Sequence, residues 1–360
     1  MTHPFAAFAQ TLAAPDLIER LRAGTIGEGM EFDTPTGPRK LVYADYVASG
    51  RALRVVEDFV MERVLPIYAN SHSEASFCGA AITQMREAGR ATIAKLCGAD
   101  ERYATIFTGA GATSALNRCV ALLGVVDALK TRAVQVFIGP YEHHSNILPW
   151  RESGAQVIEI SESENGGPDL AELAQMLAAA PENALKIGSF SAASNVSGIL
   201  TDSDAVTRLL RAHGALAVWD YAGAGPYVAI DMASGTDAQK DVIVTSPHKF
   251  IGGPAASGLL IINQAAVTRT TPSQPGGGTV RFVSPWNHDY ASDLVSREEA
   301  GTPNVIGDIR AALAFMVKDA SGQDYMDARH KAHLARARQV FADHPAITIL
   351  GNPRADRLPI

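Results

Sequence analysis

A lysine stands at the end of an apolar stretch. Lys249 follows DVIVT, lies within SPHKFIGGP, and precedes a second apolar stretch, ASGLLIIN. Desolvation disfavours the charged form of an amine, so a lysine at the end of a buried strand is expected to have a lowered pKa. Such a lysine is the type that forms a Schiff base with a carbonyl group.

A carboxylate ends another apolar stretch. Asp220 terminates LAVWD, and an acid at that depth needs a cationic or hydrogen-bonding partner. Lone acids at strand ends often cap the next helix. Here glycines and Pro226 follow Asp220, which weakens the capping alternative.

A glycine-rich turn follows the first apolar run of the same region. Residues 107–117 read FTGAGATSALN, and the spacing of Gly109, Gly111 and Ser114 is similar to a dinucleotide-binding fingerprint. That fingerprint expects an acid at the end of the next strand, and here the first acid is Glu142, beyond a Gly-Pro turn. Backbone N–H groups at a helix N-terminus bind phosphate. We expect a phosphate site without a dinucleotide; a plain tight turn is the alternative.

Polar side chains also follow other apolar runs. Adjacent side chains in an extended chain point in opposite directions and no nearby residue completes a zinc set, so His143 and His144 do not predict a metal site. One imidazole that stacks on a ring or carries protons is favoured over a surface histidine. Asn195 either donates to a ligand or braces a turn. Ser246 and His248 are placed to donate to a phosphate.

These groups together describe one ligand. A phosphate-binding turn, a stacking imidazole, an amide, a buried aspartate and a Schiff-base lysine are what pyridoxal phosphate requires. Asp220 would pair with the pyridinium nitrogen and keep the ring protonated as an electron sink. The sequence therefore predicts pyridoxal phosphate as the cofactor, attached to Lys249.

The elements that must position these residues alternate between strands and helices. From residue 103, apolar runs such as AVQVFIG and LKIGSF alternate with helical patterns such as LAELAQMLAAA. This order predicts an α/β fold, with a mostly parallel sheet and helices on both faces. Ligands of open α/β sheets bind at the carboxyl ends of the strands, where the candidate residues fall.

The chain of 360 residues is expected to have three parts. Residues 1–40 predict a helix and a Gly/Pro-rich loop, and residues 41–304 predict the large cofactor-binding domain. Residues 305–360 predict the start of a small α+β domain that stops before its later strands. In that part, two helical patterns precede one short predicted strand, ITIL, at 347–350.

Composition excludes several classes of function. Hydrophobic residues make up 47% and charged residues 19%, which allows a sizeable core. A net charge of −7 without a Lys/Arg-rich block argues against nucleic-acid binding. No apolar stretch is long enough to span a membrane, and the N-terminus lacks the basic segment of a signal peptide. Cys78, Cys97 and Cys119 form no CxxC pair and fit a reducing compartment, so a cytoplasmic location is expected.

The chain resembles the class V aminotransferase family of fold-type-I pyridoxal phosphate enzymes. Within that family it is most similar to the branch of cysteine desulfurases and selenocysteine lyases. The resemblance extends from about residue 42 to residue 351. The motifs that carry it are GAT (111–113), EHHSN (142–146), SNVSG (194–198), WDYAG (219–223), SPHK (246–249), GGGT (276–279) and REEAGTPN (297–304).

The resemblance implies a role for each residue that matches a motif. Lys249 would carry the Schiff base, His143 would stack on the ring and move protons, and Asp220 would hold the pyridinium nitrogen. Arg297 would bind the substrate carboxylate, a bidentate task suited to a guanidinium. The remaining implied cofactor contacts are Ala112, Thr113, Ser246 and His248 at the phosphate, Asn195 near the ring hydroxyl, Ala222 on the other ring face, and Thr279 at the phosphate of a neighbouring subunit. The contact of Thr279 implies a homodimer with shared active sites.

Two departures from the family pattern leave the reaction open. The family has Gln where Gly223 stands, so a donor to the ring hydroxyl is lost or comes from elsewhere. Desulfurases carry sulfur on a mobile cysteine of the C-terminal domain, whereas all three cysteines here precede Lys249. We expect a desulfurase-like or lyase-like reaction on a small amino acid, with a sulfur acceptor as a candidate partner. The alternatives are transamination or another Cα/Cβ reaction, and a catalytically inactive scaffold.

Overall fold

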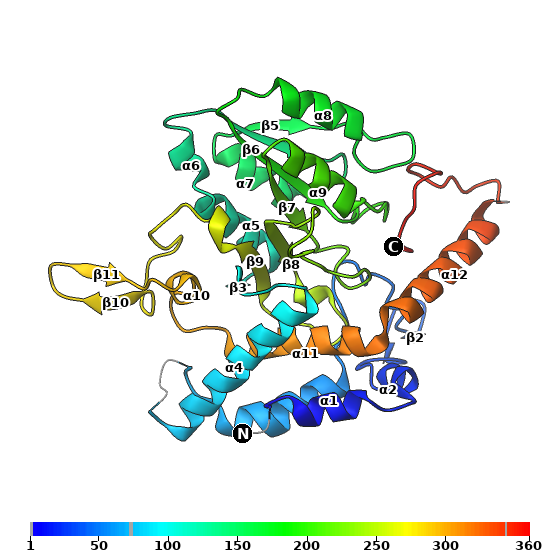
Figure 1. The fold of residues 1–360 in the computed structure, drawn as a ribbon. Helices are drawn as coiled ribbons and strands as arrows, with labels where there is room; N and C mark the ends of the chain where they lie inside the picture. The colour runs from blue at the N-terminus through cyan, green and yellow to red at the C-terminus, as the bar shows by residue number, and fades with distance from the viewer. Residues whose placement is uncertain (1–2, 72–74, 343) are drawn as a thin grey trace.

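A seven-stranded sheet forms the centre of the computed structural model, which describes residues 3–71, 75–342 and 344–360 (Figure 1). The strand order is β3-β9-β8-β7-β6-β4-β5. Four of the neighbouring pairs are parallel, and β9 runs antiparallel to both β3 and β8. The predicted mostly parallel sheet is therefore confirmed. Its strands are β3 (Tyr103–Gly109), β4 (Val134–Ile138), β5 (Gln156–Glu159), β6 (Leu185–Ser191), β7 (Leu216–Asp220), β8 (Val242–Thr245) and β9 (Gly258–Asn263).

The apolar runs form strands because side chains on both faces of the sheet are buried. All four residues of β8 are buried, for example. Successive side chains of a strand point to opposite faces. Ile243 accordingly packs into one hydrophobic cluster, whereas Val242 and Val244 pack into the other. Near-continuous apolar strands are typical of sheets that are covered on both sides.

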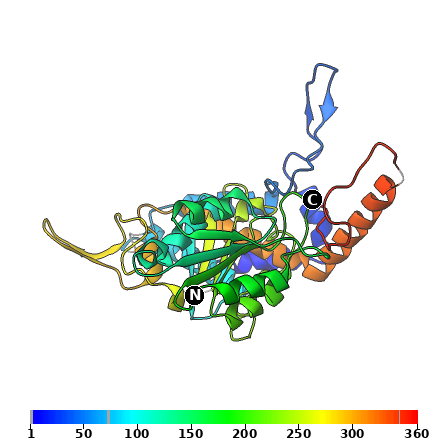
Figure 2. The same ribbon diagram turned by 90° about the horizontal axis from the view of Figure 1, so that it is seen from above.

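Helices cover both faces of this sheet, as predicted (Figure 2). One cluster is closed by α5 (Gly111–Leu122), α6 (Val125–Ala128) and α7 (Leu148–Glu152). The other is closed by α4 (Phe77–Leu96), α8 (Leu170–Ala179), α9 (Ser203–Ala212) and α11 (Val305–Ser321). Each face buries apolar side chains, and this burial is the main stabilising contribution to the fold.

The N-terminal part contains more structure than a helix and a loop. Two short helices, α1 (Ala6–Leu12) and α2 (Leu17–Ala23), are separated by Pro15, and they precede a small hairpin of β1 (Glu31–Phe32) and β2 (Arg39–Lys40). The hairpin residues are exposed, so no alternating apolar pattern indicated them. The chain then forms α3 (Arg54–Phe59), η1 (Val60–Val64) and η2 (Leu65–Ile67) before α4.

One hairpin projects from the sheet region. This second hairpin, β10 (Val280–Val283) and β11 (His288–Tyr290), extends away from the body of the molecule (Figures 1 and 2). It is followed by α10 (Leu294–Glu298). The short helices η3 (His144–Asn146), η4 (Pro247–Lys249) and η5 (Gln264–Ala266) lie in loops that follow strands.

The C-terminal part differs from the prediction at one strand. The helix α12 (Gln323–Ala342) follows α11, but residues 347–350 form no strand, so that prediction is wrong. A strand needs the backbone groups of a neighbour, and Ile347, Ile349 and Leu350 are exposed instead. The chain returns to the large domain, where the N–H of Leu358 donates to the carbonyl of Gly198 at 2.8 Å. The helix α11, which follows the predicted domain boundary at residue 304, packs against α4 of the predicted large domain. The boundary therefore stays a prediction.

None of the helices in the described ranges is long and apolar enough to cross a membrane.

Candidate active site

The lysine and the aspartate lie at the carboxyl ends of neighbouring strands. Asp220 is the last residue of β7 and pairs in register with Val244 of β8, and Lys249 ends the η4 turn that follows β8. The chain leaves Lys249 through a tight turn. A Cβ at Gly253 would lie 1.9 Å from the carbonyl oxygen of Pro247, so only glycine fits there. The sheet topology therefore brings the two groups to one edge, as expected for an open α/β sheet.

The glycine-rich turn forms the anion-binding end of the site. The helix α5 begins at Gly111, and the N–H of Ala112 donates to the hydroxyl of Ser246 at 2.9 Å. Gly111 has φ +61°, and a Cβ there would lie 2.8 Å from both Ser246 Oγ and His248 Cε1. The close approach joins the helix N-terminus to two side chains that follow β8. Such a concave set of N–H and side-chain donors suits a phosphate group.

A loop after β4 supplies the imidazole. His143 is the N-cap of η3, and its Nδ1 accepts the N–H of Ser145 at 3.1 Å. The Ser145 hydroxyl also lies 2.6 Å from the hydroxyl of Thr113, which ties the loop to the start of α5. The adjacent rings of His143 and His144 are tilted by 60° and their centroids lie 5.4 Å apart.

One cavity of about 280 Å³ gathers most of the predicted site. Nine of the eleven predicted residues line it: Ala112, Thr113, His143, Asn195, Asp220, Ala222, Ser246, His248 and Lys249. They come from the ends of β3, β4, β6, β7 and β8. Residues far apart in the sequence thus meet at one edge of the sheet.

Two predicted residues do not line this cavity. Thr279 is buried and its hydroxyl donates to the carbonyl of Gly276 at 2.7 Å. Arg297, on α10, donates through Nη2 to the carbonyl of Arg269 at 3.3 Å, and its buried Nε has no partner within the described residues. Their predicted roles at a phosphate and at a substrate carboxylate stay predictions.

Burial shifts the pKa values of the amine and the carboxyl group that line the cavity. Burial lowers the pKa of Lys249, and the opposite charges of Asp220 and Asp45 only partly offset this effect. Burial raises the pKa of Asp220, against the N–H of Ala222 and the charge of Lys249. Within the described residues, neither group is in an ion pair of 4.0 Å or less. The charge of each group therefore shifts the pKa of the other, although the two groups are not in direct contact as an ion pair.

The environment favours the neutral form of the two imidazoles of the cavity. Burial lowers the pKa of His143 and of His248, and the nearby charge of Lys249 lowers both further. A neutral ring can stack on a cofactor, and it can accept or donate a proton through its two nitrogens.

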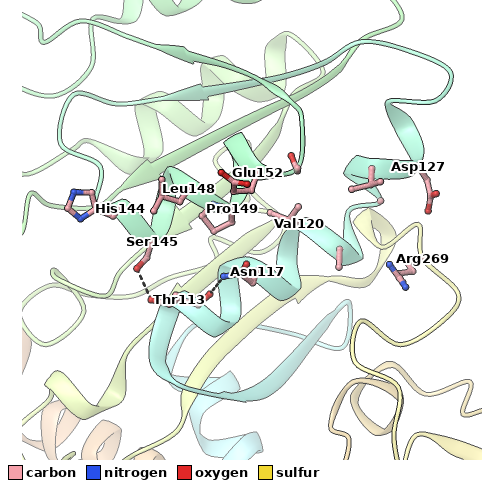
Figure 3. A pocket seen from close by; sticks show the side chains of 14 residues that line it. Thr113, Asn117, Val120, Asp127, His144, Ser145, Leu148, Pro149, Glu152 and Arg269 are labelled. Atoms are coloured by element: carbon pink, nitrogen blue, oxygen red, sulfur yellow. Dashed lines mark hydrogen bonds between the residues drawn. The ribbon is translucent and has the colours of Figure 1, made fainter.

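A second cavity of about 520 Å³ adjoins the first. It shares Thr113 and Ser145 with the central cavity, and the hydrogen bond between their hydroxyls lies at the junction (Figure 3). Its walls include α5, α6, α7, η3 and Arg269, and they combine apolar side chains such as Val120 and Leu148 with polar ones such as Glu152. Apolar and charged side chains of the second cavity thus lie next to the central cavity.

Several residues of the central cavity were not predicted. Ser145, Ser191, Ala193 and Gly223 line it. Ala110 and Gly111 also line it, and they belong to the glycine-rich turn that was expected to bind phosphate. Small residues offer no titratable group, so their types alone gave no signal. Their places after β4, β6 and β7 were the available clue, because every strand end at this edge faces the ligand.

The donor set fits pyridoxal phosphate. Gly111 lets Ser246 and His248 approach the α5 N-terminus, where a Cβ would overlap both, so that polar groups suited to an anion gather there. A carboxylate and an amine lie elsewhere in the same cavity, which matches the ring nitrogen and the carbonyl of the cofactor. The cavity is slightly smaller than the roughly 300 Å³ at which small-molecule pockets begin. The residues present therefore match both ends of the cofactor.

Comparison with known proteins identifies the family. Residues 42–359 match the Aminotransferase class-V family. A probable cysteine desulfurase of Vibrio cholerae is 30% identical over 327 residues, which cover 89% of this chain and 78% of that protein. A probable cysteine desulfurase of Streptomyces coelicolor is 28% identical over 323 residues, which cover 88% of this chain and 75% of that protein. This chain belongs to the class V aminotransferase family, as the motifs predicted.

A solved structure shows the same fold. The apo structure of a cysteine desulfurase from Thermococcus onnurineus has a TM-score of 0.73 and 23% sequence identity, and the match covers 84% of this chain and 73% of that one. The NifS-like protein of Rickettsia africae has a TM-score of 0.70 at 22% identity, and the match covers 89% and 79%. The predicted fold class is confirmed, and the chain is a cysteine desulfurase-like member of its family.

Proposed function

We propose that this protein is a pyridoxal phosphate enzyme that acts on a small amino acid in the manner of a cysteine desulfurase or selenocysteine lyase. The observation that carries the proposal is the placement of Lys249 and Asp220 in one cavity, with an anion-binding helix N-terminus in the same cavity. The similarity to probable cysteine desulfurases along 88–89% of the chain supports the choice of reaction.

Each end of the cavity would hold a different part of the cofactor. Ser246 and His248, with Ala112 and Thr113 of α5, would bind the phosphate. Asp220 would bind the ring nitrogen, and Asn195 would lie near the ring hydroxyl. His143 and Ala222 would contact the two ring faces. When bound, pyridoxal phosphate supplies an electron sink for the bond that breaks at Cα or Cβ of the substrate.

The side chains of this chain would handle protons and position the substrate. Because burial lowers the pKa of Lys249, its Nζ is more readily obtained as the free amine that accepts a proton from the substrate Cα. The neutral His143 would carry a proton near the ring. Arg297 would bind the substrate carboxylate and fix the orientation of the breaking bond.

The test is product analysis with L-cysteine. The protein loaded with pyridoxal phosphate should release alanine and sulfide in equal amounts, with a thiol present to remove the sulfur. Selenocysteine should give alanine and selenide. Cofactor-loaded protein that forms neither product from either substrate would contradict the proposed reaction.

The positions of the cysteines favour a second candidate, transamination. Burial raises the pKa of Cys119 above its ordinary value and that of Cys97 to about 12, so both thiols are inert. Cys78 lies on α4, and none of the three lines the central cavity within the described residues. Amino-group transfer from an amino acid to a 2-keto acid would show this activity. A sulfur acceptor is the candidate partner of the desulfurase reaction.

We also infer that the enzyme is a cytoplasmic homodimer that shares its active sites. Three unpaired cysteines favour a reducing compartment. The β10–β11 hairpin carries exposed apolar side chains, with Trp286 92% exposed and Phe282 56% exposed. Apolar side chains that project on an arm are typical of a surface covered by a partner. Thr279 lies at the base of this arm and lines no cavity of its own chain near Lys249.

Subunit complementation tests the shared site. Heterodimers of a Lys249→Ala subunit and a Thr279→Val subunit would hold one intact site if Thr279 serves its neighbour. They should then recover about half of the wild-type activity, whereas each variant homodimer stays impaired. Heterodimers without recovery would show that Thr279 serves its own subunit, and a monomer in solution would refute the dimer.

A further inference from the structure

A hydrogen-bond network centred on Glu142 adjoins the cavity. Glu142, in the loop between β4 and η3, accepts the N–H of Ser191 through Oε1 at 2.9 Å and the Ser191 hydroxyl through Oε2 at 2.6 Å. Its Oε2 also accepts the side-chain amide N–H of Asn146 at 2.6 Å. Glu142 is partly exposed as a residue, but its carboxylate oxygens face two buried residues.

Asn146 is held in turn by buried partners. Its Oδ1 accepts the hydroxyl of Ser189 at 2.6 Å and the indole N–H of Trp150 at 3.3 Å. The three residues are fully buried. Because Oδ1 already accepts two donors, the amide nitrogen must point to Glu142. The network therefore favours a group at position 142 that only accepts, which is an ionised carboxylate.

This network fixes the loop that supplies the imidazole. His143 and Ser145 lie between Glu142 and Asn146, and both line the central cavity. The anchor of the loop, Ser191, also lines the cavity and pairs in register with Asp220. The carboxylate of Glu142 thus links the loop of His143 to β6. The strand β6 lies next to β7, which ends at Asp220.

We propose that Glu142 is a positioning residue of the site, whose carboxylate fixes the His143 loop on β6 and places a negative charge behind Asp220. The inference rests on the proposed function. Asp220, on β7, is the charged group that faces Glu142. Burial first, and then the charge of Asp220, raise the pKa of Glu142 to about 7, against the hydrogen bonds of Ser191 and Asn146. The carboxylate therefore gains its charge near neutral pH.

Glu142→Gln is the direct test, with Glu162→Gln as the matched control. Glu162 is exposed and accepts the hydroxyl of Tyr141, the residue before Glu142, outside the cavity. In either orientation, the NH2 group of a glutamine at 142 would face a donor, which is the amide of Asn146 or the N–H of Ser191. Its affinity for pyridoxal phosphate should fall by about fivefold to a hundredfold, the range for leaving buried donors unpaired. The control should stay within about twofold, as surface substitutions usually do.

A second readout separates positioning from simple loss of stability. The absorbance of the bound cofactor titrates with pH when it is attached to Lys249. Removing a negative charge should move the midpoint to lower pH in Glu142→Gln, because the cationic form loses a favourable neighbour. A purely structural role would lower the melting temperature without moving this midpoint.

Ser191→Ala keeps the test valid if Glu142→Gln does not fold. It removes the hydroxyl donor and leaves the backbone N–H and the Glu142 carboxylate in place, so the affinity for pyridoxal phosphate should fall by less than in Glu142→Gln. The inference is overturned if wild-type protein binds the cofactor and the folded variants match it in affinity and in pH midpoint. Wild-type protein that bound no pyridoxal phosphate would instead overturn the proposed function, and this inference with it.

Discussion

Lys249 and Asp220 face the same cavity but do not form an ion pair with each other in the described structure. Each has a pKa moved toward its neutral form by burial. A ligand that contacts both groups would restore favourable partners to each, because an opposite charge or a hydrogen bond stabilises the charged form. The electrostatic cost of the two residues is therefore explained by the ligand that lies between them in the proposed complex.

Asp220→Asn tests the acid at the residue scale. The amide keeps the size of the side chain and its acceptance of the Ala222 N–H, which lies 2.7 Å away in the wild type. It removes the charge that would keep the ring nitrogen protonated. The turnover number should fall by about 10²–10³-fold, the usual cost of removing one preorganised electrostatic group. Steady-state kinetics with saturating cofactor measure it, and unchanged turnover would exclude the pairing.

Gly111→Ala tests the phosphate end. The residue has φ +61°, and the new Cβ would lie 2.8 Å from Ser246 Oγ. The strained backbone and the contact with Ser246 would both disrupt the predicted phosphate site. We expect the affinity for pyridoxal phosphate to fall at least about tenfold, as for a loss of one or two kcal/mol.

Gly223→Ala is the matched control for Gly111→Ala. A Cβ at 223 would lie 3.6 Å from Cβ of Asn195, which is ordinary van der Waals contact, in the same cavity. Its cofactor affinity, measured by absorbance titration, should stay close to that of the wild type. Equal losses in the two variants would contradict the assignment of the phosphate to the α5 N-terminus.

At the scale of elements, a buried ion network joins α4 to the segment around α10. Glu299 pairs with Arg90 at 2.7 Å and with Arg86, and Arg86 also pairs with Asp308 of α11 at 2.6 Å. Glu299 further accepts the N–H of Phe107 in β3 at 2.8 Å. The network fixes the segment that contains Arg297 to the sheet and to two helices.

Glu299→Gln should therefore destabilise the fold. Two buried arginines would lose their shared carboxylate, and breaking a buried pair costs about 3–5 kcal/mol. Urea denaturation measures the free energy of unfolding. Glu87→Gln is the control, because that side chain is 52% exposed and its pairs with Arg90 and Arg86 contribute at most about 1 kcal/mol. Equal stabilities of Glu299→Gln and the wild type would contradict the role of the network.

The same network predicts acid sensitivity. Burial alone would raise the pKa of Glu299, but the charges and hydrogen bonds of Arg90 and Arg86 leave it lowered. A carboxyl with a lowered folded-state pKa stabilises the fold above its unfolded-state pKa and loses this contribution as pH falls through the folded-state value. The stability difference between wild type and Glu299→Gln should shrink in acid. A constant difference from neutral pH to acid pH would contradict the shift.

The sequence predicted those helices and strands whose apolar residues recur in a regular pattern, because the side chains at these positions are buried. The strands β3 to β9 were visible as apolar runs because both faces of the sheet are covered. The hairpin β1–β2 and the acidic network of Glu142 were not predicted, because exposed strands carry no apolar period and a hydrogen bond between distant residues leaves no local pattern. The strand expected at 347–350 was wrong because β propensity alone does not supply a pairing neighbour.

At the scale of the whole molecule, most of the candidate site could be predicted because one edge of the sheet collects the residues that follow its strands. Asp220 and Lys249 are distant in sequence, and only the parallel topology brings them together. The places of Thr279 and Arg297 could not be derived in this way, since neither follows a strand at that edge. Their roles were read from the resemblance, which assigns Arg297 to the substrate carboxylate and Thr279 to the phosphate of a neighbouring subunit.

The most direct test of the central claim is to locate the cofactor on the chain. Borohydride reduction of the protein loaded with pyridoxal phosphate, followed by digestion and mass spectrometry, should place the cofactor on Lys249. Lys318 is an internal control, since it is half-buried and burial lowers its pKa to about 8, but it lies on α11 outside the central cavity. Lys249→Ala should show no fixed cofactor. Attachment to Lys318, or to the Lys249→Ala variant, would contradict the assignment of the site.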